Sequence, residues 1–581
     1  MSSRLRRFLV LGTLLTLVLG VSAPGAAPPA GIPGNPTNTK VAGIDIDATT
    51  IPQLQELMNA RRINAVELVT FYQRRIRQLN PALKAVITLS PTALADARAA
   101  DAARRRGDRR PLLGIPIIVK DNINTTAMPT TAGSWALAGN MPEDAFIVER
   151  LKEAGAIILG KANLSEWANF RSAPSSSGWS GIGGQGAMPY VLDRNPCGSS
   201  SGSAVVAAAS LAVAAVGTET DGSIVCPSGA NGVVGIKPTL GLWSREGIVP
   251  ISADQDTAGP IARNVTDAAV LLGAATGEDP NDPATEGQEA ETDYTQFLDD
   301  EALKGKRIGV WRAGTTFDPG AEAALEPILD GVVEALEAQG ATVVEGADID
   351  LSDAFGPELF ALLCEFKTDI GSYLTTYTTG TNPVTGQPYP QTLAELIAFN
   401  EAHPDLEGPW NSLIFELAEG TDGRGSQDCD DARAATTPPA QEAIDGLLED
   451  LELDAIVALT NGPAWPINSN PDEGDLDGQF QFFVGSSWAA AMAGYADITV
   501  PAGSLEGLPI GVTFIGGAWD EPELIGFAYD FEQATKVRRP PQYVPTIGDA
   551  LFPGLPSAAA FAGPKRTHAS RVEQLRLVRF K

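Results

Sequence analysis

The sequence has only two histidines, His403 and His568, among its 581 residues. In most serine hydrolases an imidazole oriented by a carboxylate takes the proton from the nucleophile. His403 lies in a polar stretch just before Pro404, and His568 lies in a basic C-terminal segment, so neither position suits that role. A serine that does chemistry in this chain therefore needs another base, and lysine is the obvious candidate.

Sequence signals for bound groups are missing as well. The chain has no metal-ligand spacing, no G-x-G-x-x-G after a strand and no P-loop. We therefore expect no metal and no cofactor. The scarcity of histidine also argues against a metal-dependent hydrolase.

Basic residues are outnumbered, since 41 Lys and Arg stand against 72 Asp and Glu, for a net charge of −31. Such a charge keeps a protein soluble and repels nucleic acid and anionic membranes. We therefore expect no nucleic acid partner. The last segment, 551–581, is basic and contrasts with the rest of the chain.

The apolar run Phe8–Val21 follows three arginines and is too short to span a membrane. It predicts a signal peptide over residues 1–23 and no membrane span. A Pro-, Ala- and Gly-rich lead-in, 24–45, is expected to be disordered. These features predict a secreted or cell-envelope protein.

Cysteine is scarce, with four residues that could form at most two disulfides. Cys197 and Cys226 flank two serine-containing turns, so an oxidising compartment would permit a bond between them. Two buried thiols packed as small apolar groups are the favoured interpretation.

The two serine-containing turns are the main chemical signal that is present. They span 197–203 (CGSSSGS) and 218–223 (TETDGS). The pattern G-x-S-x-G around Ser200 resembles a nucleophile elbow, but no strand precedes it and no suitable histidine follows. The apolar stretch Ala204–Val216 indicates a buried helix or helix-strand segment rather than a flexible linker. A third element, LGIPIIVKDN, predicts a strand that ends at Lys120.

Together these motifs resemble the amidase signature family. The resemblance rests on Lys120 in GIPIIVKDN, Ser199 in CGSSSGSA and Ser223 in TETDGSI, followed by GVVGIKPT at 232–239. It extends over Ile51–Val544, and the sequence around Ser223 is most similar to that of bacterial peptide amidases, which remove ammonia from C-terminal peptide amides.

The resemblance implies a Ser-cisSer-Lys triad, with Ser223 as nucleophile, Ser199 on a cis peptide as proton relay and Lys120 as neutral base. Burial would supply that neutral base by lowering the pKa of Lys120. We expect the backbone N–H groups of Thr220, Asp221, Gly222 and Ser223 to form the oxyanion hole. The Asp221 side chain, where the commoner pattern has glycine, is expected to orient the turn rather than act as a base.

We therefore expect a secreted serine amidohydrolase that acts through an acyl-enzyme on C-terminal amides of peptides, as a monomer or homodimer. The alternatives are an aryl amide, carbamate or oligoamide hydrolase of the same family, or a non-catalytic binding protein on this scaffold. The negative charge argues against a component of a tRNA-dependent amidotransferase, which is a role that some relatives have.

The hydrophobic pattern predicts one large α/β domain, 46–550, with a central mixed β-sheet covered by helices on both faces, as the resemblance also implies. Expected strands are 156–159, 307–311, 342–344, 455–459, 498–500 and 510–515. Expected helices are 53–59, 65–79, 321–339 and 441–448. The polar stretch 277–292 is expected to be an exposed loop.

An aromatic-rich segment without strand pattern, 353–433, predicts a helical insertion. It could form a lid and substrate wall, or its aromatic residues could belong to core packing. The segments 165–171 and 178–186 are further candidates for lining the substrate pocket, by resemblance.

Overall fold

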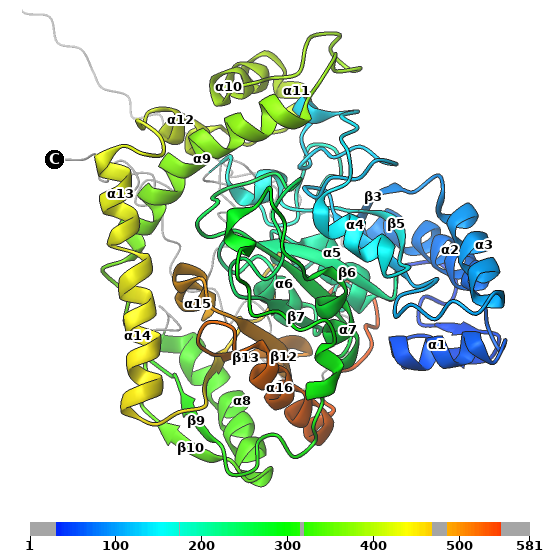
Figure 1. Ribbon diagram of the computed structural model, residues 1–581, viewed down its shortest axis with the longest axis vertical. Helices are drawn as coiled ribbons and strands as arrows, with labels where there is room; N and C mark the ends of the chain where they lie inside the picture. The colour runs from blue at the N-terminus through cyan, green and yellow to red at the C-terminus, as the bar shows by residue number, and fades with distance from the viewer. Residues whose placement is uncertain (1–30, 173–174, 314–318, 468–484, 548–581) are drawn as a thin grey trace, which may run out of the picture.

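The computed structural model describes residues 31–172, 175–313, 319–467 and 485–547. The expected signal peptide and the basic tail lie outside these residues, so both stay predictions. The described chain folds around one large mixed β-sheet that helices flank (Figure 1). This architecture confirms the predicted fold class.

The main sheet has eleven strands in the order β10-β9-β11-β13-β12-β7-β8-β6-β4-β5-β3. Strand β4 pairs in parallel with both β5 and β6, while β6 pairs antiparallel with β8. The strands are β3 (Val86–Leu89), β4 (Pro116–Lys120), β5 (Ile157–Ala162), β6 (Ala214–Glu219), β7 (Val234–Lys237), β8 (Thr257–Ala262), β9 (Arg307–Val310), β10 (Thr342–Glu345), β11 (Ala455–Leu459), β12 (Asp497–Leu505) and β13 (Leu508–Ile515). A separate pair, β1 (Lys40–Val41) and β2 (Ile44–Asp45), lies in the lead-in 24–45. This end of the lead-in forms strands instead of being disordered, because Val41 and Ile44 pack against the main core.

Strands β4, β5 and β6 are buried along their whole length. Parallel strands covered on both faces need apolar side chains on both, which explains the continuous run PIIV before Lys120. Because β4 and β6 run in the same direction as neighbours, their carboxyl ends bring Lys120 and Thr218 to the same edge of the sheet.

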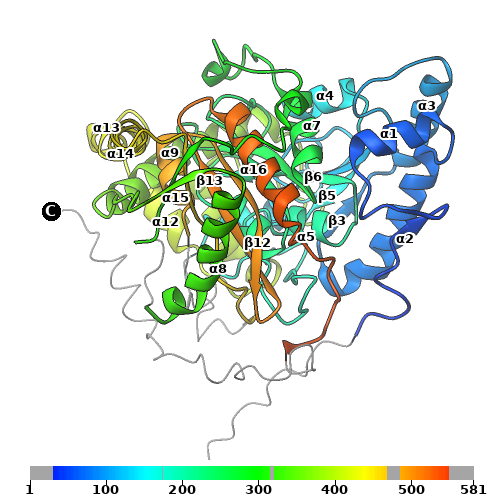
Figure 2. The ribbon, with the colours of Figure 1, turned by 90° about the horizontal axis from the view of Figure 1, so that it is seen from below.

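Most helices pack against the sheet. Helices α5 and α6 contact strands of the sheet centre, α7 contacts β8, and α8 and α16 contact β12. Figures 1 and 2 place α1–α3 on the opposite side of the molecule from α13 and α14. The helices are α1 (Ile51–Asn59), α2 (Ala65–Leu83), α3 (Ala93–Arg105), α4 (Phe146–Glu153), α5 (Ser201–Ala208), α6 (Val225–Ala230), α7 (Val265–Ala275), α8 (Pro319–Ala338), α9 (Phe355–Tyr377), α10 (Leu393–Ala402), α11 (Pro404–Glu407), α12 (Leu413–Glu419), α13 (Gln427–Ala434), α14 (Thr437–Asp450), α15 (Ser487–Ala493) and α16 (Glu521–Thr535).

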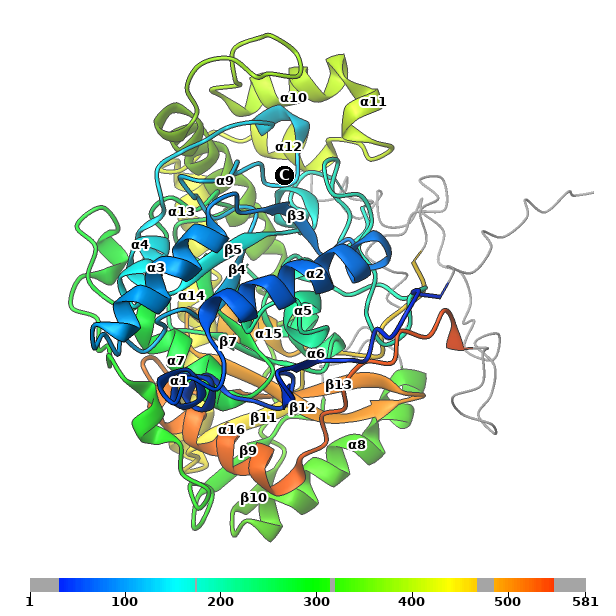
Figure 3. The same ribbon diagram turned by 90° about the vertical axis from the view of Figure 1, so that its right-hand side faces the viewer.

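The aromatic-rich segment folds as the helices α9–α13, at the opposite end of the molecule from α8, β9 and β10 (Figures 1 and 3). Several of its aromatic side chains form a buried cluster. Phe366 stacks on Phe415 at 5.3 Å and meets Phe170 edge-on at 5.0 Å. These rings therefore belong to core packing, and the role of the segment as a substrate wall stays a prediction.

Another expectation about local structure is wrong. Cys197 and Cys226 form a disulfide instead of remaining buried thiols, because tertiary folding brings them together, and Cys364 and Cys429 form a second one. The stretch 277–292 is a mostly exposed loop, as expected. Within it, Asp279 and Asp282 are buried and accept hydrogen bonds from Ser244 Oγ and Arg245 Nε.

Candidate active site

Lys120 ends β4 and is completely buried. Its Nζ donates to Ser199 Oγ at 2.7 Å, to Thr218 Oγ1 at 2.8 Å and to the Thr218 carbonyl at 3.1 Å. These three contacts use all the donors of an ammonium group, and all three partners are neutral. Burial lowers the pKa of Lys120 to about 7, against the opposing attraction of Asp256 and Glu219. A neutral amine near physiological pH is therefore available at this position.

The two serines predicted from sequence lie next to each other. Ser199 Oγ donates to Ser223 Oγ at 3.0 Å, so Lys120, Ser199 and Ser223 form one continuous hydrogen-bonded chain. Ser199 is fully buried and Ser223 is 7% exposed, which places Ser223 at the outer end of the chain. The peptide bond between Gly198 and Ser199 is cis.

Ser200, at the centre of the G-x-S-x-G pattern, has a different role. It is fully buried, its hydroxyl donates to the Thr218 carbonyl at 2.9 Å, and it accepts from the Thr218 N–H at 3.1 Å. Its N–H donates to the Ser223 carbonyl at 3.1 Å. Ser200 therefore joins the two serine turns and does not serve as a nucleophile.

Glu219 organises the turn that carries Ser223, a role that the sequence analysis missed. Its carboxylate accepts from the N–H groups of Gly222 at 2.9 Å, Ile224 at 2.6 Å and Val225 at 3.0 Å. Burial raises the pKa of Glu219, while Lys237 and these N–H groups oppose the shift. The signal for this role is an acidic residue a few positions before the start of α6, where N–H groups lack partners within the helix.

The predicted oxyanion donors lie on this turn. The Gly222 N–H already donates to Glu219, so an oxyanion would compete with a carboxylate for it. Gly222 has φ +75°, and a Cβ there would come within 2.9 Å of Ser487 Oγ, so the turn requires glycine. The exposed Asp221 accepts from Ser487 Oγ at 2.7 Å, an interaction that orients its side chain.

Buried polar side chains form hydrogen bonds with the turn that carries Ser223. Thr220 Oγ1 donates to Asp256 at 2.5 Å, and Gln255 Nε2 donates to the Thr220 carbonyl at 3.0 Å. Gln255 also donates to Glu358 of α9 at 2.7 Å and accepts from Arg433 of α13 at 2.9 Å. The helices α9 and α13 are thus connected to the Ser223 turn through one glutamine.

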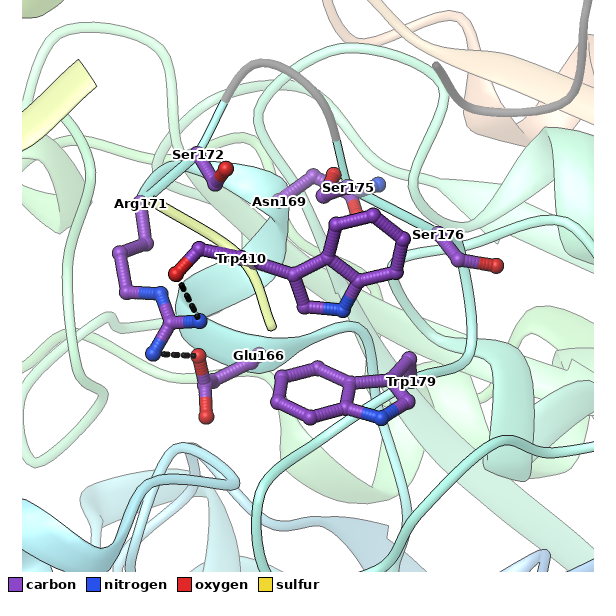
Figure 4. A pocket seen from close by; sticks show the side chains of 8 residues that line it. All are labelled: Glu166, Asn169, Arg171, Ser172, Ser175, Ser176, Trp179 and Trp410. Carbon is purple, nitrogen blue, oxygen red and sulfur yellow. Dashed lines mark hydrogen bonds and ion pairs between the residues drawn. The ribbon is translucent and has the colours of Figure 1, made fainter. Parts of the chain in front are cut away.

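A small cavity lies beside the segment 165–171 (Figure 4). Here Arg171 forms ion pairs with Glu166 at 2.7 Å and Glu407 at 3.1 Å, and the indoles of Trp179 and Trp410 meet edge-on at 6.1 Å. The lining residues are Glu166, Asn169, Arg171, Ser172, Ser175, Ser176, Trp179 and Trp410. None of Lys120, Ser199 and Ser223 lines it, so the cavity is separate from the hydroxyl chain.

The backbone next to this cavity has an unusual conformation. Trp167, Ala168 and Asn169 have φ values of 50°, 54° and 70°, in the left-handed region that favours glycine. Non-glycine residues in this conformation cost free energy and occur only where the surrounding structure stabilises them, which is often at functional sites. Ser165, just before this turn, connects it to the hydroxyl chain, since its N–H donates to the Ser199 carbonyl at 3.1 Å.

Within the described ranges 31–172, 175–313, 319–467 and 485–547, no group of three or more His, Cys, Asp or Glu side chains is arranged to hold a metal ion. Nor does any helix in the same ranges combine the length and apolar character needed to cross a membrane.

Comparisons with known proteins identify the family of this chain. A family model described as Amidase matches residues 67–525. A probable amidase of Arabidopsis thaliana is 40% identical over 515 residues, which cover 86% of this chain and 92% of that protein. A glutamyl-tRNA(Gln) amidotransferase component of Caldanaerobacter subterraneus is 30% identical, with 86% and 99% covered.

A solved structure is more similar in sequence. The native peptide amidase from Stenotrophomonas maltophilia is 45% identical, has a TM-score of 0.78 and is matched over 85% of this chain and 99% of its own. The predicted resemblance is confirmed by a match that includes the segments carrying Lys120, Ser199 and Ser223. The chain belongs to the amidase signature family and is an amidase.

Proposed function

We propose that this protein hydrolyses the C-terminal amides of peptides, with Ser223 as nucleophile, Ser199 as proton relay and Lys120 as general base. The observation that carries the proposal is the hydrogen-bonded chain from buried Lys120 through Ser199 to Ser223. It gives the nucleophile a base without histidine.

The direction of this chain depends on the charge of Lys120. When Lys120 is protonated, its Nζ donates to Ser199, which donates to Ser223. When it is neutral, the bonds reverse, so that Ser223 donates to Ser199 and Ser199 donates to the Nζ lone pair. Attack by Ser223 on the amide carbon then moves two protons, one from Ser223 to Ser199 and one from Ser199 to Lys120.

The rest of the reaction uses the same groups. The carbonyl oxygen becomes an oxyanion, for which the N–H groups of Thr220, Asp221 and Ser223 are the proposed donors, with Gly222 shared with Glu219. One such donor is worth about 3–4 kcal/mol of the barrier. Lys120 returns a proton through Ser199 to the leaving nitrogen, ammonia departs, and water hydrolyses the acyl-enzyme by the reverse proton route.

The choice of peptide amides rests on similarity and charge. The Stenotrophomonas protein is called a peptide amidase and shares 45% identity with this chain. The tRNA-dependent relatives share less, and a net charge of −31 opposes binding of a polyanion. Aryl amides and carbamates remain the alternative substrates, because the same nucleophile attacks any acyl carbon that the pocket admits.

The first experiment measures ammonia release from a neutral blocked dipeptide amide at mildly alkaline pH. We expect ammonia from the wild type and none from Ser223→Ala. Carbamate cleavage without ammonia release, tested with an aryl carbamate of similar size, would keep the triad and contradict the peptide amide substrate. Equal activity of Ser223→Ala would contradict the triad.

We also propose export of the protein through its N-terminal segment. The apolar run Phe8–Val21 after three arginines supports this, and the acidic composition suits a soluble exported enzyme. Mass spectrometry of the protein produced in a bacterial host tests it. A mature chain that begins near residue 24 is expected, and an intact N-terminus in the cytoplasm would contradict it.

A further inference from the structure

We propose that the disulfide between Cys197 and Cys226 positions the catalytic hydroxyls, by fastening the turn that carries Ser199 to the turn that carries Ser223. The inference rests on the proposed function, in which Ser199 relays the proton of Ser223. It assigns to this cysteine pair a role in the reaction that acts through the two serines.

The position of the bond supports this role. Cys197 lies two residues before Ser199, and Cys226 lies three residues after Ser223, in the first turn of α6. The bond therefore closes a loop that contains both serines together with α5 and β6. Of the two disulfides in the described residues, it is the one whose cysteines flank these serines in sequence.

The other connections between the turns are hydrogen bonds. Besides the contact between the two catalytic hydroxyls, they include the Ser200 N–H to the Ser223 carbonyl at 3.1 Å and the two bonds between the Ser200 hydroxyl and the Thr218 backbone. Next to the turns, Asn231 Nδ2 donates to the Pro196 carbonyl at 2.8 Å. Hydrogen bonds tolerate shifts of a few tenths of an ångström, whereas a misplacement of about 1 Å near reacting groups costs roughly 100-fold in rate. A covalent connection limits such shifts.

The backbone at Cys197 gives a second argument. Its φ is +57°, in the region that favours glycine, and its N–H donates to Asn195 Oδ1 at 2.9 Å. A residue with a Cβ is unfavourable in this conformation. The presence of cysteine at this position is therefore explained by its side chain rather than by its backbone.

The bond also borders the oxyanion turn. Cys226 is half-buried, and its Cβ is 4.0 Å from the position that a Cβ on Gly222 would occupy. Cys197 is 5% exposed. Because Cys226 is the less buried of the two cysteines, we expect a small reductant to approach the bond from its side. The Cys226 N–H donates to the Gly222 carbonyl at 2.9 Å, so we expect a movement of α6 after cleavage to displace Gly222 and Ser223.

The second disulfide provides a matched control. Cys364–Cys429 joins α9 to α13 and closes a segment of 65 residues, against 29 for Cys197–Cys226. In the chain-entropy model the longer loop contributes more to stability. Loss of Cys364–Cys429 is thus expected to reduce stability at least as much. Neither of its cysteines lies in a serine turn or takes part in the Gln255 hydrogen bonds that connect α9 and α13 to the Ser223 turn.

The experiment compares the double variants Cys197→Ser/Cys226→Ser and Cys364→Ser/Cys429→Ser with the wild type. Four quantities are measured: Tm, kcat for a peptide amide, KM for the same amide, and the rate at which a small fluorophosphonate labels Ser223. For Cys197→Ser/Cys226→Ser we expect kcat and the labelling rate to fall about 10- to 100-fold, with KM changed less than about threefold. The control is expected to keep its labelling rate within about twofold while its Tm falls.

Reduction of the folded wild type keeps the test independent of folding of the variant. A dithiol passes two electrons and two protons to the bond, yielding thiols at Cys197 and Cys226 and the cyclic disulfide of the reagent. Alkylation and peptide mapping identify which bond has opened. We expect labelling of Ser223 to slow in proportion to free Cys197 and to recover on reoxidation.

Two results would contradict different claims. An unreactive Ser223 in the wild type would contradict the proposed function. A reactive Ser223 whose labelling rate is the same with and without the Cys197–Cys226 bond, or which slows equally in the control, would contradict only the positioning role.

Discussion

Lys120 is a lysine in the protein interior whose hydrogen-bond partners are all neutral. Burial favours its uncharged form and lowers its pKa to about 7. Since the base acts only when neutral, we expect kcat to rise with pH through about 7 and then level off. A pH–rate profile between pH 5.5 and 9 checks this, and a rate that falls over this range would contradict Lys120 as the base.

Substitution of the same residue tests its role directly. Lys120→Met keeps the length of the side chain but removes the amine, and general bases typically contribute 10²- to 10⁴-fold. We expect kcat to fall by at least about 100-fold while the protein stays folded by circular dichroism. Lys304→Met, at an exposed position, is the control and should leave kcat unchanged.

Glu219 holds the turn that carries Ser223, the proposed nucleophile. Its carboxylate accepts three backbone hydrogen bonds, and hydrogen bonds to a charged group are each worth about 1.5–3 kcal/mol. Glu219→Gln retains the shape but presents an NH₂ donor to backbone N–H donors. We expect both a lower Tm and a kcat reduced by tenfold or more. The exposed Glu301→Gln serves as the comparison, and an unchanged kcat in Glu219→Gln would contradict the organising role.

Helices α9 and α13 are linked to the site through Arg433, which pairs with Glu365 at 2.6 Å and donates to Gln255 at 2.9 Å. Arg433→Met would leave the buried Glu365 without its positively charged partner, a loss of about 3–5 kcal/mol for such pairs. We therefore expect a clearly lower free energy of unfolding in urea. Lys304→Met, which breaks an exposed pair, should change it by less than about 1 kcal/mol.

The sequence predicted the elements that have strong hydrophobic patterns. β4, β11 and β13 are apolar runs, and their prediction is confirmed. β7 and β8 were not expected, because β7 has only four residues with a Gly among them and β8 contains Gly and Pro. They form strands by pairing with each other and with β12 and β6.

The same limit applies to the site. The motifs identified Lys120, Ser199 and Ser223, and the fold brings them together. Gln255 was missed, because its partner Glu358 lies 103 residues away and only tertiary structure connects the two. The disulfides were misjudged for the same reason.

For the molecule as a whole, buried carboxyl groups predict the dependence of stability on pH. Burial raises the pKa of Asp256 and of Asp267 to about 6, and that of Glu532 to about 7. The folded state then binds protons that the unfolded state has lost, so the stability contributed by these groups is complete below about pH 4 and is lost as pH rises to about 7.

We therefore expect Tm at pH 5 to exceed Tm at pH 7, and the net charge of −31 acts in the same direction because its self-repulsion weakens at lower pH. Thermal unfolding in dilute solution measures this. Asp267→Asn removes one contributor and should reduce the difference. A Tm that increases from pH 5 to pH 7 would contradict the prediction.

The chain Lys120–Ser199–Ser223 contains two hydroxyl protons that move in the same step of the proposed reaction. In heavy water both positions carry deuterium. The acylation step should then be slowed by the product of two isotope effects. A plot of its rate against the deuterium fraction of the solvent should lie below the straight line that joins its two ends. Two serines in series thus predict a curved plot, whereas a single histidine base that takes one proton predicts a straight line.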